Sequence, residues 1–220
     1  MNKATARHLF HKSPLHRPMK RRLQQSADQA SSCALTAQCL ATYERLLMAH
    51  PNDAPQVQAH TLRFIFPAIA YYETLAPLWG EQRTLATIKS ALEESSKPAR
   101  RLLRFLLRFR PLRRRFPAFC RTMTGKNYGP CAGFRYELRS KSPWVLQFDM
   151  LECPYVTLCR HHGCPELTAL FCDLDDFLYA DLHPDLLWQR KGTLGRGAPQ
   201  CDFFFAYQGA DPRLTPPNTP

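Results

Sequence analysis

The stretch FRYELRSKSPWVLQFDM, residues 134–150, decides the fold class because the spacing of apolar residues changes here. Apolar and polar residues alternate within 134–139 and again within 144–150, which is typical of strands with one buried face. The intervening SKSP has turn chemistry, so the two runs predict an antiparallel hairpin.

After the hairpin the chain returns once to a helical period and then to strands. Residues 165–178 carry apolar side chains every three or four positions, and a proline stands at the start, where a missing N–H is harmless. The runs LLWQRKGTL, 186–194, and CDFFFAY, 201–207, are strand-like and flank a loop that contains glycines. Residues 130–207 therefore predict a β-β-α-β-β unit.

Before the hairpin, residues 28–115 have the apolar spacing of amphipathic helices. The run PNDAP at 51–55, Gly80 and Pro98 divide this part into about four helices. Pro67 lies inside the second helical pattern and is expected to kink it, because proline removes a backbone donor and clashes with the preceding turn.

The predicted fold class is α+β, in which an N-terminal helical layer is followed by a small antiparallel sheet with one inserted helix. The helical part, 28–115, and the sheet part, 130–207, are expected to form a single domain over 28–207. Residues 1–27 are basic and have no sustained period, which predicts a mostly disordered arm. Residues 208–220 form a proline-rich tail with too little apolar mass to pack.

The cysteine content indicates a reducing compartment. The nine cysteines are odd in number and include no CxxC pair, which argues against a disulfide scaffold. The basic N-terminus lacks the apolar core of a secretory leader, and no stretch is apolar enough for a transmembrane helix. A cytoplasmic location is therefore expected, and an organelle transit peptide is the alternative.

The net charge of +12 is concentrated in the N-terminal arm and in the arginine-rich segment 99–115. Arg101, Arg104 and Arg108 share one helical face, while apolar residues share another. Such a helix either covers the core, with arginine stems lying on apolar side chains, or contacts an anionic membrane or a partner protein. No RNA-binding motif or helix-turn-helix accompanies it, so no nucleic-acid partner is expected.

The run CPYVTLCRHHGC, residues 153–164, is rich in metal-ligating residue types. Its cysteines are separated by five and four residues, whereas structural zinc sites usually have a tight knuckle and a second ligand pair. No bound metal and no cofactor are therefore expected. In this interpretation Cys159 and Cys164 are small apolar residues or mark the start of a helix.

Two Cys-Asp pairs stand at either end of the last helix–strand segment. On the helix, Asp175 falls at the margin of the apolar stripe and is a surface neighbour of Cys172, three residues earlier. Burial there would raise the pKa of Asp175 and suit it to proton transfer; the alternative is a carboxylate that caps a loop N–H. On the strand, Cys201 and Asp202 are expected to point to opposite faces.

Together these residues resemble the L-2-amino-thiazoline-4-carboxylic acid hydrolase-like family. The resemblance rests on three ordered stretches and covers about residues 30–207. The stretches are FPAIAYYETLAPLWGEQRTLATI (66–88), FDMLECPYVTLCRHHGCPELTALFCDLD (148–175) and RKGTLGRGAPQCDFFF (190–205). Their ordered combination is more specific than any one of them.

The resemblance implies an enzyme that hydrolyses a small cyclic amidine, such as the 2-amino-thiazoline-4-carboxylate ring, and such proteins also occur in specialised metabolism. The ring carbon between two nitrogens and a sulfur is electrophilic when protonated. A thiolate can attack it while a carboxylic acid protonates the departing nitrogen, which breaks a non-peptide C–N bond. The expected partner is this small molecule, and the sequence predicts no oligomeric state.

The residues that match the family stretches supply the implied site. The implied catalytic residues are Cys153, Cys172, Asp175, Cys201 and Asp202, and the implied substrate-binding residues are Tyr155, Arg190, Thr193 and Gly197. Cys172 or Cys153 would be the nucleophile, Asp175 the acid/base, and Arg190 the partner of the substrate carboxylate.

One open alternative is another reaction on a cysteine-derived or peptide intermediate, such as ring formation run in reverse. Two further alternatives concern the site and the role of the protein. In the first, the cysteines only pack around a site where Asp175 or Asp202 activates water directly. In the second, the protein is a non-catalytic ligand-binding or docking protein of the same fold that uses the basic amphipathic helix within 99–115.

Overall fold

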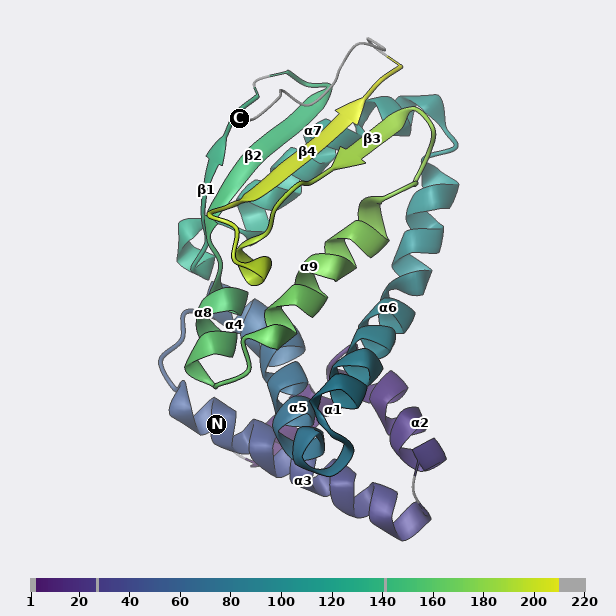
Figure 1. The fold of residues 1–220 in the computed structure, drawn as a ribbon. Coiled ribbons are helices and arrows are strands. Elements are labelled where there is room, and N and C mark those ends of the chain that lie inside the picture. The colour runs from purple at the N-terminus through teal and green to yellow at the C-terminus, as the bar shows by residue number, and fades with distance from the viewer. Residues whose placement is uncertain (1–2, 27, 141, 210–220) are drawn as a thin grey trace. The chain divides into compact units, whose positions relative to one another are not determined.

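The computed structural model describes residues 3–26, 28–140 and 142–209, and the proline-rich tail predicted over 208–220 lies almost wholly outside them. The fold is α+β, as predicted: helices dominate the N-terminal part, and four antiparallel strands follow (Figure 1). Among the described residues, no helix is both long and apolar enough to cross a membrane.

The chain divides into two compact units where the sequence predicted a single domain. Unit 1 contains residues 1–95 and 157–171, and unit 2 contains residues 96–156 and 172–220. Three helices run from one unit into the other: α6 (Glu81–Leu106), α8 (Pro154–His161) and α9 (Glu166–Tyr179).

Unit 1 is helical and includes most of the arm that was predicted to be disordered. Helices α1 (Lys3–Lys12) and α2 (His16–Ser26) pack on α3 (Gln29–Ala49), so that prediction is wrong for the described part of the arm. The side chains of Phe10, Leu15, Met19 and Leu23 are fully buried. Leu15, Met19 and Leu23 follow one another at four-residue spacing, a helical signal that the surrounding basic residues obscure.

The second predicted helix is divided near Pro67. Helix α4 (Pro55–His60) leads into a π-helical turn (Thr61–Ile65), and α5 (Phe66–Trp79) follows. Since proline has no N–H, the Arg63 carbonyl loses its usual helical donor, and the Ser13 hydroxyl donates to it instead at 2.9 Å. The Leu62 carbonyl accepts from the Tyr43 hydroxyl at 3.0 Å, so side chains satisfy the irregular turn.

The third and fourth predicted helices are one helix, α6, which continues through Pro98. A further helix, α7 (Arg110–Asn127), begins where the sequence predicted the helical part to end. Pro111 lies in the first turn of α7, where its missing donor has no intrahelical partner to lose. The first correction comes from Pro98, which was interpreted as a boundary and which the helix accommodates.

Unit 2 contains the sheet, whose strand order is β1-β2-β4-β3. The predicted hairpin is present: β1 (Arg135–Leu138) pairs with β2 (Val145–Glu152). The last strand, β4 (Cys201–Tyr207), lies between β2 and β3 (Leu186–Gln189), and all pairs are antiparallel. Short helical turns cover Pro130–Ala132 and Leu194–Arg196.

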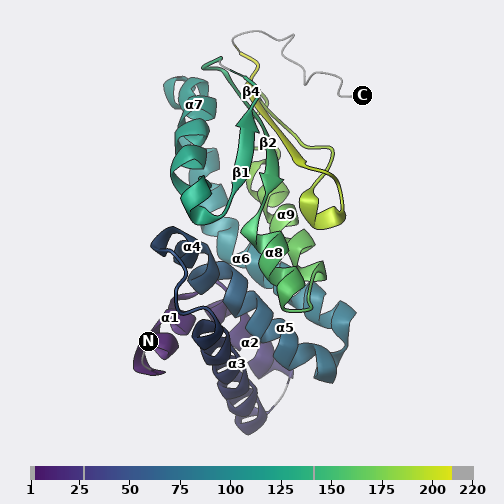
Figure 2. The same cartoon turned by 90° about the vertical axis from the view of Figure 1, so that its left-hand side faces the viewer.

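The two faces of the sheet differ in character. One face carries the main core of unit 2, in which Phe148 stacks on Phe203 and the ring of Phe116 from α7 meets Phe205 at 5.3 Å. Figure 2 shows α7 running along the sheet. The other face carries a smaller apolar cluster, Val145, Phe204 and Ala206, together with polar side chains.

Candidate active site

The strand-side Cys-Asp pair holds the first part of the loop between β3 and β4. Asp202 Oδ1 accepts hydrogen bonds from the backbone N–H groups of Lys191 (2.9 Å) and Gly192 (2.7 Å). Cys201 Sγ accepts from the backbone N–H of Leu194 at 3.2 Å. Adjacent strand residues point to opposite faces, so this pair contacts the loop from both sides of the sheet.

The helix-side pair on α9 holds the next part of the same loop. Asp173 forms an ion pair with Arg196. The Cys172 thiol lies beside the Thr193 hydroxyl and the backbone N–H of Gly195. The loop is thus fixed over Cys172, and one role of both Cys-Asp pairs is to position it.

Arg190 lies at the centre of this arrangement, and its side chain is only 2% exposed. Its guanidinium donates to Asp176 Oδ2 at 2.7 Å, to Asp175 Oδ2 at 3.2 Å and to the Cys172 carbonyl at 2.6 Å. It also lies over the ring of Phe203, 5.1 Å from the ring centre. A buried arginine with two carboxylate partners orients both of them.

The carboxyl group of Asp175 is desolvated, although its side chain is partly exposed to solvent. Burial of the carboxyl raises its pKa to about 6; the Arg190 charge opposes this shift and the Asp176 charge adds to it. The side chain is nevertheless 36% exposed, so solvent reaches part of it. A carboxyl group with such a pKa can accept or donate a proton near neutral pH.

The thiols of Cys153, Cys172 and Cys201 lie close enough for their charges to interact. Burial raises the pKa of Cys153 to about 12 and that of Cys201 to about 11. Burial also raises the pKa of Cys172, but Thr193, Arg190 and the Gly195 N–H act in the opposite direction. All three are therefore protonated at neutral pH, and Cys172 has the surroundings that best favour a thiolate.

Of the two predicted substrate-binding residues in the loop, Thr193 lies beside the Cys172 thiol and Gly197 shapes the backbone. The Thr193 hydroxyl is buried and makes no hydrogen bond of normal geometry within the described residues, although it lies next to Cys172. A buried hydroxyl without a partner is available to a bound molecule. Gly197 has a φ of 85° and ends the Leu194–Arg196 turn, a conformation that favours glycine.

The remaining predicted residues, Asp202 and Tyr155, have other surroundings. Asp202 faces the opposite side of the sheet, as the strand alternation predicted. Tyr155 lies in the first turn of α8 and its ring is 6.3 Å from that of Phe134. Its backbone N–H, with that of Val156, contacts the sulfur of Cys153, so Cys153 caps this helix.

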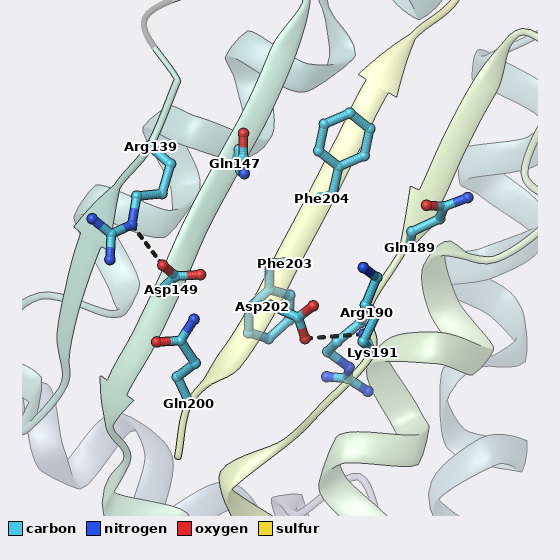
Figure 3. Close-up of a pocket in the computed structure, with 10 residues that line it drawn as sticks. All are labelled: Arg139, Gln147, Asp149, Gln189, Arg190, Lys191, Gln200, Asp202, Phe203 and Phe204. Carbon is cyan, nitrogen blue, oxygen red and sulfur yellow. Dashed lines mark hydrogen bonds and ion pairs between the residues drawn. The ribbon is translucent and has the colours of Figure 1, made fainter. Parts of the chain in front are cut away.

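Unit 2 has a cavity of about 410 Å³ on the polar face of the sheet (Figure 3). Of the predicted site residues, Arg190 and Asp202 line it. Opposite Asp202 on the neighbouring strand lies Asp149, which is paired with Arg139 at 2.6 Å. The other lining residues are Gln147, Gln189, Lys191, Gln200, Phe203 and Phe204. The cavity therefore adjoins the thiol cluster through Arg190.

The sequence analysis did not select several residues of the site. Asp176 shares Arg190 with Asp175, but its position on the helix suggested only a solvent-exposed carboxylate. Tyr128 lies close enough to Asp175 and Cys153 to interact with both, and nothing in its local sequence indicates this. The pairing of Asp149 with Arg139 follows from the hairpin register, which alternation alone could have suggested.

Comparison with known proteins agrees with these motifs. No curated protein and no solved structure matches the chain. A family model described as L-2-amino-thiazoline-4-carboxylic acid hydrolase matches residues 58–205, which include the thiol cluster, Asp175 and the loop above them. The chain belongs to the L-2-amino-thiazoline-4-carboxylic acid hydrolase family.

Proposed function

We propose that the protein hydrolyses a small cyclic amidine, such as 2-amino-thiazoline-4-carboxylate, by breaking a ring C–N bond at the thiol cluster of unit 2. The observation that carries this proposal is that Cys153, Cys172 and Cys201, from segments spread over about fifty residues, lie close together, with Asp175 near Cys172 and Cys201. The name of the family supports hydrolysis of this substrate class.

Cys172 is the proposed nucleophile. Its side chain is partly exposed, whereas Cys201 is buried and already accepts a backbone hydrogen bond. Cys153 is also partly exposed, but it caps α8 and burial raises its pKa to about 12. The neighbours of Cys172 that favour a thiolate, Thr193 and Arg190, make it the most readily activated of the three.

Asp175 is the proposed acid/base, and Arg190 orients it. The ionised carboxylate accepts the Cys172 proton as the sulfur attacks the ring carbon. It then returns that proton to the ring nitrogen as the C–N bond breaks. Water adds to the same carbon, and the Cys172 sulfur leaves as the carbonyl forms, so one water is consumed and the enzyme is regenerated.

The predicted pairing of Arg190 with the substrate carboxylate stays a prediction. In the free protein its terminal nitrogens already donate to Asp175, Asp176 and the Cys172 carbonyl. A substrate carboxylate would have to replace one of these partners. The Thr193 hydroxyl lies beside the Cys172 thiol and makes no hydrogen bond of normal geometry within the described residues, so it can bind substrate without such an exchange.

The test is incubation of the purified protein with the aminothiazoline carboxylate, followed by mass spectrometry and NMR of the product. The proposal expects turnover and an S-carbamoyl product, since the C–N bond breaks. An N-carbamoyl product would show cleavage of the C–S bond instead and would contradict the proposed step.

Single substitutions assign the roles. Cys172→Ser is expected to lower turnover by on the order of 10³-fold or more, as for other lost nucleophiles. Cys33→Ser, an exposed thiol of unit 1, is the matched control and should retain full turnover. Full activity of Cys172→Ser would favour direct activation of water by Asp175, the alternative that the sequence left open.

A second candidate function is docking on an anionic lipid bilayer, and exposed apolar side chains in unit 2 favour it. Leu102, Phe105, Phe109 and Leu112 are 47–58% exposed around the junction of α6 and α7. Exposed arginines surround them: Arg101, Arg104, Arg108, Arg110, Arg114 and Arg115. Apolar side chains among positive charges suit the boundary between acyl chains and anionic headgroups.

Co-sedimentation with vesicles tests the docking function. Binding to vesicles with anionic lipid should exceed binding to zwitterionic vesicles and should weaken as salt rises. Substitution of Phe105 and Phe109 by serine should reduce binding, whereas Leu138→Ser, an equally exposed residue of β1, should not. Absence of pelleting with anionic vesicles would exclude a bilayer as the partner.

A further inference from the structure

Unit 1 contains a cluster of three histidines that the proposed function does not use. His50 ends α3, His161 is the last residue of α8, and His162 follows it. One ring nitrogen from each lies within 4.8 Å of the others. His50 and His162 are 112 residues apart in the chain, so the fold alone brings them together.

The spacing of the two nearest nitrogens fits a shared metal ion. His50 Nε2 and His162 Nε2 are 3.2 Å apart. With metal–nitrogen bonds of about 2.0–2.1 Å and tetrahedral angles, two ligand nitrogens lie about 3.3 Å apart. The side chain of His161 is exposed, so a change of rotamer can bring its ring to the third position.

The carboxylate of Asp53 lies next to the ring nitrogen of His50 that is not near His162. Asp53 Oδ1 lies 3.7 Å from His50 Nδ1, the nitrogen that points away from His162. Histidines that ligate metals usually donate their other N–H to a carboxylate, which fixes the tautomer with a free lone pair on Nε2.

A cavity adjoins the cluster within unit 1. It has a volume of about 410 Å³, and His50, Asp53, Thr61 and Phe66 are among the residues that line it. The Thr61 hydroxyl is buried and makes no hydrogen bond within the described residues. Thr61 begins the π-helical turn, a distortion that is frequent at functional sites.

The charges around the cluster are mixed. Two cations near the cluster would oppose a metal ion: Arg45, which forms an ion pair with Glu73, and Lys3, which lines the cavity. Asp53 and Glu44 contribute negative charge on the cavity side.

We propose that His50, His161 and His162 bind a divalent transition-metal ion of the zinc type, with Asp53 orienting His50. Imidazole ligands suit Zn²⁺, Cu²⁺ and Ni²⁺ and disfavour Mg²⁺ and Ca²⁺. Three protein ligands leave a coordination position open for water or another small ligand. The sequence predicted no metal because the cysteine spacing in 153–164 lacks a zinc knuckle, and it gives no sign that His50 joins the two adjacent histidines.

The test uses the full chain, stripped with a chelator and kept reduced. Titration with Zn²⁺ by calorimetry should give one equivalent per chain. His50→Gln and His162→Gln should each weaken binding by at least about tenfold, and Asp53→Asn by about 10–100-fold, as for other carboxylates behind a ligating histidine. His8→Gln, an exposed histidine of α1, should bind as the wild type does.

Because the chain has nine cysteines, the ligands must be identified independently. Visible absorption of the Co²⁺ form should show tetrahedral Co²⁺ without a thiolate charge-transfer band. A thiolate band, or unchanged stoichiometry in the His50→Gln/His162→Gln variant, would overturn the assignment. Circular dichroism identifies any variant that fails to fold. Zn²⁺ should also raise the melting temperature of the wild type more than that of Asp53→Asn.

Discussion

At the scale of single residues, Asp175 connects the thiol cluster to proton transfer. Burial raises its pKa to about 6, and Arg190 limits this rise. If its ionised form accepts the Cys172 proton, kcat/KM should increase with pH up to about 6 and then level. A pH–rate profile measures this limb, and Asp175→Asn should abolish it together with most of the turnover. A profile that falls through pH 6 would instead identify the protonated form as the active one.

Arg190 acts on Asp175 through charge as well as through position. The guanidinium favours the ionised carboxylate, so Arg190→Gln should raise the pKa of Asp175 and move the rising limb to higher pH. The measurement is the same profile, recorded beside Arg196→Gln, which removes the exposed partner of Asp173. If the limb stays in place while KM rises, Arg190 binds the substrate carboxylate instead.

At the scale of elements, the π-helical turn depends on a hydroxyl from the N-terminal arm. Ser13→Ala leaves the Arg63 carbonyl without its donor and should lower the free energy of unfolding by about 1–3 kcal/mol. Pro67→Ala restores a backbone N–H that can reach the same carbonyl. Chemical denaturation of the two single variants and the double variant gives the coupling free energy between the two positions. Ser13→Ala should lower the free energy of unfolding by less when residue 67 is alanine. If Ser13→Ala lowers the free energy of unfolding equally with proline and with alanine at position 67, the stabilising effect of the Ser13 hydroxyl does not depend on Pro67.

The strands were predictable because their signals are local. Alternation in 134–150 gave the hairpin, and the face carrying Leu146, Phe148 and Met150 is indeed buried. The arm was not predictable from its polarity, since its helices are stabilised by contacts with α3 rather than by their own composition. Pro98 was taken as a helix start, yet α6 continues through it.

The candidate site was predictable only in part, for the same reason. Cys172 and Asp175 are neighbours on one helix, so their proximity follows from helical geometry. The approach of Cys153 and Cys201 was supplied by the family stretches and not by spacing. The histidine cluster depends on a contact between residues 112 positions apart, and no local pattern in the sequence indicates that contact.

At the scale of the whole molecule, the nine cysteines divide by exposure. Cys33 and Cys131 are exposed; Cys120, Cys153 and Cys172 are partly exposed; and Cys39, Cys159, Cys164 and Cys201 are buried. Alkylation requires a thiolate that the reagent can reach, and burial raises the pKa of Cys39, Cys120, Cys153, Cys172 and Cys201. The native protein should therefore react quickly at two thiols and slowly at the others.

Iodoacetamide labelling at neutral pH, followed by peptide mass spectrometry, measures each rate. Cys33→Ser/Cys131→Ser should remove the fast phase, and denaturant should make all remaining thiols react alike. Cys172 should be slow in the free enzyme, because its activation awaits proton transfer to Asp175 with substrate in place. Fast labelling of Cys172 without substrate would mean that the thiolate is preformed, and Asp175 would then be needed only to protonate the leaving nitrogen.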